Sequence, residues 1–159
     1  MGLKINDEIK NIALGAALRP GDNYKAAAFG TLSSRSGLWA LIFFGGALGG
    51  AIAGSANKNV FVIPTDNTMK IVQLGTWNTS KVEQVFDIPY GELTKVKHTK
   101  GSLGAHFIKF RVGKVKYRLT MTERGGKNLP GQKENAQIIS QIFADIQKAQ
   151  RAQKVKKAS

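Results

Sequence analysis

The most constraining feature of the sequence is a pair of alternating segments joined by two residues, AHFIKFRV-GK-VKYRLTMT (105–122). In both segments apolar and polar residues alternate, which is the period of a half-buried β-strand. A two-residue connection with glycine first suits the type II′ turn of a β-hairpin. The segment therefore predicts an antiparallel hairpin around Gly113 and Lys114, and the position of this turn fixes its register.

Pairing outward from the turn divides the hairpin into an apolar face and a basic face. The apolar face, expected to lie in the core, contains Ile108, Phe110, Val112, Val115, Tyr117 and Leu119. The basic face contains Lys109, Arg111, Lys116 and Arg118. Directly opposed like charges destabilise a sheet. These four side chains therefore either extend into water, or are neutralised by Glu83, Asp87 or Glu92 on a neighbouring strand, or form a patch that binds the anionic headgroups of a partner.

The charge of the whole chain is consistent with such a patch. The sequence has 24 Lys and Arg against 10 Asp and Glu, and residues 101–159 alone carry 13 against three. The resulting field attracts lipid headgroups, nucleic acid or acidic proteins. Cysteine is absent from the sequence, which excludes disulfides and thiolate zinc sites.

The other segments predict an α+β domain in which strands precede one closing helix. Strands are expected at 24–34 (weakly), 59–65, 69–75, 81–90 and 91–99, and helices at 5–18 and 134–150. The apolar stripe of the first helix comprises Ile5, Ile9, Ile12 and Ala16. The stripe of the last helix comprises Ile138, Ile139, Ile142, Phe143 and Ile146. The basic residues that follow are expected to fray.

The stretch LWALIFFGGALGGAIAG (38–54) lies within 22 uncharged residues, 36–57. As a helix these would measure about 33 Å, close to the roughly 30 Å of bilayer hydrocarbon. The side chains predicted to insert are Leu38, Trp39, Leu41, Ile42, Phe43, Phe44, Leu48 and Ile52. Gly46, Gly50 and Gly54 recur at every fourth position and predict a helix-packing groove, which is typical of helices in lipid. The alternative is a helix buried within a soluble oligomer or under the sheet. Neither a Walker nor a GxGxxG pattern is present, so a nucleotide site is not predicted.

Four segments resemble a bacterial pleckstrin-homology-like (PH-like) domain, namely VFVIPTDNTMKIVQLG, FDIPYGELTKVKHTKGSLG, FIKFRVGKVKYRLTM and GQKENAQIISQIF. They cover residues 59–148, and LRPGDNYKAAAFG (18–30) is similar to the opening strand of that family. The resemblance implies an antiparallel, partly open β-barrel or sandwich closed by a C-terminal helix. It also implies an association with membrane segments and, in some relatives, oligomeric rings. It supplies no lipid-binding signature that transfers residue by residue.

The expected organisation follows from these segments: an N-terminal helix and turn (1–23), a first strand (24–35), a Gly-rich apolar helix (36–57), a PH-like domain (58–150) and a basic tail (151–159). If the first strand belongs to the same sheet as the later strands, a single membrane crossing at 36–57 is impossible, because both flanks then lie on one side. Either the segment lies in one leaflet as a re-entrant or interfacial helix, or the first strand is wrongly assigned. A true span would place the N-terminal helix outside. It would hold the domain that follows, with 19 Lys and Arg after residue 57, in the cytoplasm.

The sequence contains no recognisable catalytic constellation. His98 and His106 are its only histidines, and the carboxylates are scattered over turns and strand ends. An enzyme, a metal site, a cofactor and a small-molecule substrate are therefore not predicted. His106 is expected at the surface or at a sheet edge.

The sequence thus predicts a non-enzymatic module on the cytoplasmic side of a bacterial cell membrane, which binds anionic lipid or an acidic protein and self-associates. Candidate tasks are scaffolding, the envelope stress response and protection against a membrane-active peptide. One alternative is a soluble oligomeric PH-like adaptor that binds an acidic protein or peptide. Another is nucleic-acid binding, which is disfavoured because Phe110 and Tyr117 point to the core rather than outward to stack on bases.

Overall fold

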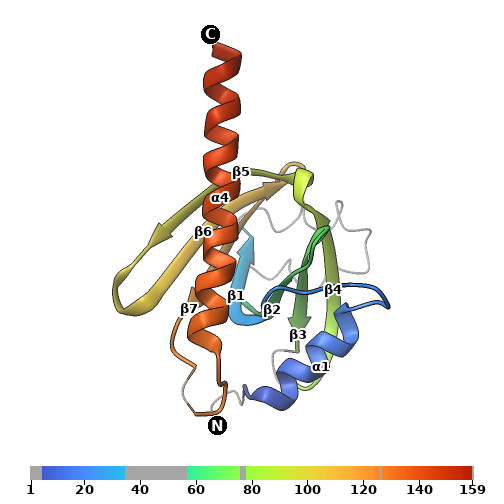
Figure 1. Ribbon diagram of the computed structural model, residues 1–159. Helices are drawn as coiled ribbons and strands as arrows, with labels where there is room; N and C mark the ends of the chain where they lie inside the picture. Colours follow the sequence, from blue (N-terminus) through green and yellow to red (C-terminus); the bar gives the residue numbers. More distant parts are fainter. Residues whose placement is uncertain (1–4, 35–56, 76–77, 126, 159) are drawn as a thin grey trace.

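Seven strands form one antiparallel sheet in the computed structural model, which describes residues 5–34, 57–75, 78–125 and 127–158 (Figure 1). The strands are β1 (Ala28–Ser34), β2 (Lys58–Pro64), β3 (Thr68–Leu74), β4 (Val82–Pro89), β5 (Leu93–Lys100), β6 (Ala105–Val112) and β7 (Val115–Thr122). Their order in the sheet is β4-β3-β2-β1-β7-β6-β5, so β4 and β5 are the two edges. The sheet curls beside the C-terminal helix α4 (Gln132–Ala158). This arrangement is consistent with the PH-like fold expected from the sequence.

The inner face of the sheet, which faces α4, carries the larger hydrophobic core. All seven strands contribute to it, and α4 adds Ala136, Ile139 and Phe143. Ile142 and Ile146 are partly buried against the same core, as the apolar stripe predicted, whereas Ile138 is exposed. The six hairpin residues assigned to the core by alternation are all buried. Helix α4 also differs from the prediction in length, because it continues through the basic tail to Ala158.

A second core lies on the outer face of β2 and β3, beneath the N-terminal helix α1 (Asp7–Ala17). Phe61 and Ile63 of β2 and Val72 and Leu74 of β3 point into this core. Since Val60, Val62 and Ile71 point into the inner core, both strands are buried on both faces and read as nearly continuous apolar runs. Helix α1 therefore covers one half of the outer face of the sheet.

The buried stripe of α1 agrees with the predicted one at Ile5, which lies just before the helix and is partly buried, and at Ile9, but not in the rest of the helix. Ile9, Ala13 and Ala17 face the sheet, whereas Ile12 and Ala16 are exposed. The small alanines let the helix approach the strands closely, and a stripe chosen by side-chain size misses them. Asn6 caps the helix by accepting a hydrogen bond from the backbone of Ile9 at 3.1 Å.

The covered half also contains a buried cation. Lys70 of β3 is 3% exposed, and its ammonium group lies 3.1 Å from Asp87 of β4 and 3.6 Å from Asp22 in the loop after α1. Burial opposes ionisation of Asp87, but hydrogen bonds from Thr68 and Lys70 outweigh it and lower the pKa of this carboxyl group. A charge under α1 is thus neutralised by two carboxylates.

Candidate anion-binding site

The β6–β7 hairpin has the predicted register. Lys109 lies opposite Arg118, and Arg111 lies opposite Lys116. Gly113 has a φ of 61°, and Lys114 does not share this left-handed conformation, as a type II′ turn requires. The hairpin therefore holds two pairs of like charges side by side on the outer face of the sheet.

The opposite side of the hairpin anchors these cations in the core. Phe110 and Tyr117 lie opposite each other and are 2% and 4% exposed, with ring centroids 5.4 Å apart. Phe143 of α4 stacks on Phe110 with centroids 5.9 Å apart. Burial raises the pKa of Tyr117. Since Phe110 and Tyr117 are held in the core by this packing, the backbone positions from which the basic side chains project are fixed as well.

Strand β5 adds two lysines that the sequence analysis did not assign to the site. Lys97 lies opposite Lys109, so Lys97, Lys109 and Arg118 form a row across three strands. Lys95 lies in a β-bulge of β5 and has a left-handed backbone with a φ of 49°. The bulge allows Leu93 and Val96, three residues apart, both to be buried. The alternation Lys-Val-Lys beside the predicted hairpin was the available signal.

Together these residues form what we call the cationic face, which comprises Lys95, Lys97, Lys109, Arg111, Lys116 and Arg118. They line a pocket of about 290 Å³ to which Phe110 and Tyr117 also contribute. No acidic residue lines it.

The carboxylates considered as neutralising partners lie elsewhere. Glu83 and Asp87 belong to β4, the sheet edge opposite β5. Glu83 accepts a hydrogen bond from Gln73 at 2.9 Å, and Asp87 pairs with Lys70. Glu92 is exposed in the short 3₁₀ helix η1 (Tyr90–Glu92). Among the residues that the structure describes, no ion pair joins a carboxylate to the cationic face.

Arg118 is held against the outer face by an aromatic ring. Its guanidinium carbon lies 5.6 Å from the ring centroid of Phe107, which is half-buried on β6. This is the geometry of a cation–π contact. Because the guanidinium lies over the ring, Phe107 does not offer a free surface on which a base could stack.

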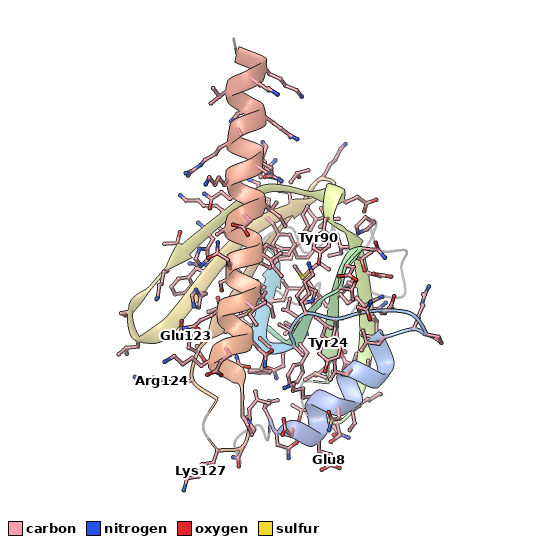
Figure 2. The ribbon with its side chains drawn as sticks, viewed as in Figure 1. Glu8, Tyr24, Tyr90, Glu123, Arg124 and Lys127 are labelled. Carbon is pink, nitrogen blue, oxygen red and sulfur yellow. The ribbon has the colours of Figure 1, made fainter. Side chains whose placement is uncertain are left out.

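The histidines form a connected chain that sequence reasoning missed. His106 is 4% exposed rather than at the surface; its Nδ1 lies 3.0 Å from Nε2 of His98 and its Nε2 lies 2.9 Å from Oε1 of Glu123. Gln137 of α4 donates to the same Glu123 oxygen at 3.3 Å, so Glu123, labelled in Figure 2, links the histidines to the helix. The signal was present, because His106 falls in the same alternation phase as Ile108.

The surroundings of these hydrogen-bonded side chains shift the pKa values of two of them, His98 and Glu123. Burial, together with the neighbouring His106 and Lys100, lowers the pKa of His98. The hydrogen bond from His106 lowers the pKa of Glu123. Within the described part of the chain, no group of three or more His, Cys, Asp or Glu side chains is arranged to hold a metal ion.

The apolar stretch predicted to enter the membrane, with its inserting side chains and its glycine row, lies outside the described residues. Its flanks are described: Ser34 ends β1 opposite Tyr117, and Lys58 begins β2 opposite Leu32. Since β1 and β2 are neighbours in one sheet and α1 packs on it, the alternative with a single crossing and the N-terminal helix outside is wrong. No helix among the described residues is long and apolar enough to cross a membrane.

Comparisons with known proteins yield a structural likeness only. No protein-family profile matches the sequence, and no curated protein matches it. One similar solved structure is the hSac2 domain from human phosphoinositide phosphatase Sac2, with 12% sequence identity and a TM-score of 0.47. The likeness covers 83% of this chain and 75% of that chain.

Proposed function

We propose that this chain is a non-enzymatic PH-like module that binds the anionic headgroups of a membrane through its cationic face. The observation that carries the proposal is the set of six cations on three adjacent strands, none of which is paired with a described carboxylate. Like charges side by side weaken a sheet. Their presence on an otherwise well-packed hairpin is understandable if an anionic partner offsets the repulsion.

The shape of the face favours a surface over a small molecule. The residues that line the pocket spread across β5, β6 and β7 rather than enclosing one deep cavity, because all six cations lie on three neighbouring strands. The two arginines present planar forks that match phosphate oxygens, whereas the four lysines act as flexible point charges. Near an anionic bilayer each base contributes about 1 kcal/mol. The four hairpin cations would then contribute up to about 4 kcal/mol, or roughly a thousandfold in affinity.

The predicted apolar segment would supply a second anchor beside this face. Ser34, the last residue of β1, lies opposite Tyr117, whose neighbours along β7 are Lys116 and Arg118. A segment that leaves β1 here and returns at β2 could lie in one leaflet with the cationic face against the headgroups. The cytoplasmic leaflet, whose anionic lipids attract basic proteins, is the proposed location. Self-association and a task in envelope stress or peptide protection remain predictions.

The test is sedimentation with vesicles of phosphatidylglycerol and phosphatidylcholine, compared with vesicles of phosphatidylcholine alone. The test variant replaces the hairpin cations with glutamine: Lys109, Arg111, Lys116 and Arg118. The matched control replaces four exposed lysines elsewhere: Lys25, Lys81, Lys127 and Lys133. We expect the test variant to lose at least tenfold in affinity for acidic vesicles, and the control to lose less than threefold.

Equal losses in the two variants would mean that net charge alone drives binding, and would overturn the proposed site. Absence of binding to acidic vesicles would overturn the membrane function itself. Tight, salt-sensitive binding to DNA or to an acidic peptide, without binding to vesicles, would establish one of the alternative functions instead.

A further inference from the structure

A second basic groove lies on the other side of the edge strand β5, between this strand and the C-terminal half of α4. It has a volume of about 600 Å³. The cations that line it are Lys95, Lys97, Arg151 and Lys154, and no acidic residue lines it. Lys95 and Lys97 therefore belong both to this groove and to the cationic face.

Hydrogen bonds hold α4 in place along this groove. Gln150 accepts from the backbone of Val96 at 3.1 Å and donates to the carbonyl of Leu93 at 2.7 Å. Gln147 accepts from the backbone of His98 at 3.1 Å. The C-terminal end of α4 projects past the sheet (Figure 1). The side chains of residues 151–157, which follow Gln150 along the helix, are exposed. The two glutamines thus fix α4 against β5 directly before the helical turn that carries Arg151 and Lys154.

Lys95 occupies the point where the two basic surfaces meet, and its backbone is strained there. A left-handed conformation disfavours residues with a Cβ atom, and glycine adopts it freely. Lysine at such a position of a bulge indicates a use for its side chain, since strained backbones cluster at functional sites. The only other described non-glycine residue with positive φ is Leu103, at 58°, in the β5–β6 connection.

From these observations we infer that the groove between β5 and α4 is a second anion-binding site, and that Lys95 joins it to the cationic face in one surface that wraps around β5. This inference rests on the proposed function and extends it. The membrane contact then includes the projecting end of α4 as well as the hairpin. The chain binds two sets of headgroups on an acidic bilayer, one on each side of β5.

The first experiment compares Lys95→Gly with Leu103→Gly. Both changes relieve a left-handed backbone, so the melting temperature is expected to stay the same or rise in both. Only Lys95→Gly removes a shared cation, and we expect about a three- to fivefold loss in affinity for phosphatidylglycerol vesicles. Leu103→Gly should retain wild-type affinity. A Lys95→Gly protein with wild-type affinity, or equal losses in the two variants, would overturn the role of Lys95.

The second experiment tests the groove itself with the double variant Arg151→Gln/Lys154→Gln. Its control, Lys133→Gln/Lys148→Gln, removes two exposed charges from the same helix outside the groove. We expect about a tenfold loss in the groove variant and less than a twofold loss in the control. Equal losses would overturn the second site, even if the hairpin variant described above still lost binding and so supported the proposed function.

Inorganic tripolyphosphate distinguishes a membrane surface from a free polyanion. Under the inference, tripolyphosphate competes weakly with vesicles, and the groove variant shows its loss on vesicles. A groove variant that lost affinity for tripolyphosphate but retained vesicle binding would assign the groove to a soluble ligand and overturn the membrane assignment.

Discussion

The outer faces of the two halves of the sheet differ in burial and in the pairing of their charges. Beneath α1, the outer face of β2 and β3 is apolar and buried, and its one buried lysine, Lys70, is paired with two carboxylates. On β5, β6 and β7 no described helix covers the outer face, and six cations lie there without a described carboxylate partner. This fold can therefore neutralise a lysine where its own packing requires it. The half without a described ion pair on its outer face is therefore the half proposed to bind a partner.

The largest effect is expected from breaking the cover of the apolar half. Ala13→Asp places a carboxylate at a fully buried position between α1 and the sheet. We expect a loss of about 3 kcal/mol or more in the free energy of unfolding, since an unpaired charge cannot stay in that interface. Urea denaturation measures it. Ala16→Asp, exposed on the same helix, is the control and should cost only about 1 kcal/mol, through lower helix propensity and its place near the helix C-terminus. Similar losses in both would show that α1 does not depend on the Ala13 contact.

The second largest effect on stability is expected when a buried, paired lysine is truncated, compared with a lysine of the cationic face. Lys70→Ala should cost about 2 kcal/mol, because it removes a buried stem and leaves Asp87 and Asp22 without their shared partner. Lys109→Ala, on the cationic face, should stay within about 0.5 kcal/mol of wild type. Chemical denaturation of both variants gives the comparison. Equal costs would contradict the distinction between paired and unpaired halves.

Acidification should lower the stability of the folded protein through His98 of β5. Its pKa is lowered below the ordinary value of 6.5, so the unfolded chain takes up a proton that the folded chain resists. Stability should therefore fall as the pH drops below 6.5, down to the folded pKa. The groups around His98 are His106, Lys100 and the Gln147 amide. The readout is the melting temperature between pH 7 and 5, and the slope should flatten in His98→Gln. An unchanged slope in this variant would assign the titration to another group.

Further acidification should produce a second loss of stability, through Asp87 and Glu123. The pKa values of Asp87 and Glu123 are lowered from 3.8 and 4.5, so their contributions are present at neutral pH and disappear as the pH falls through the folded values.

The smallest effect should have the opposite sign. Lys109→Glu places a carboxylate opposite Arg118 and Lys97, which replaces two like-charge neighbours with opposite-charge pairs. We expect a gain of about 0.5 kcal/mol in stability together with weaker binding to acidic vesicles. Lys127→Glu, at an exposed position in the loop before α4, is the control and should not gain as much stability. A destabilised Lys109→Glu protein would show that repulsion on the cationic face is not appreciable.

Much of the fold could be predicted because alternation and turn chemistry are local. The β6–β7 register followed from one glycine and a two-residue turn, and every expected strand is present. The docking of α1 could not be predicted in the same way, since it depends on small alanines that fit against a particular sheet face. Its indirect signal was the unbroken apolar character of NVFVI and the IV pair of β3, which alternation alone does not explain.

The candidate site was predicted in part for the same reason. The four hairpin cations share a phase that the sequence reveals, whereas Lys95 reaches the site through a bulge, and a bulge breaks the phase. Arg151 and Lys154 meet β5 only because α4 continues as a helix into residues expected to fray. The histidine chain required pairing β5 with β6 across an irregular connection.

Gln147 and Gln150 of α4 also protect the edge strand β5 against aggregation. An edge strand with free amide and carbonyl groups is a template to which a further strand can add. Gln147 and Gln150 occupy such groups of β5 at Leu93, Val96 and His98. Release of α4 from β5 at Gln147 and Gln150 would uncover this template, and we expect aggregation through β5 to follow.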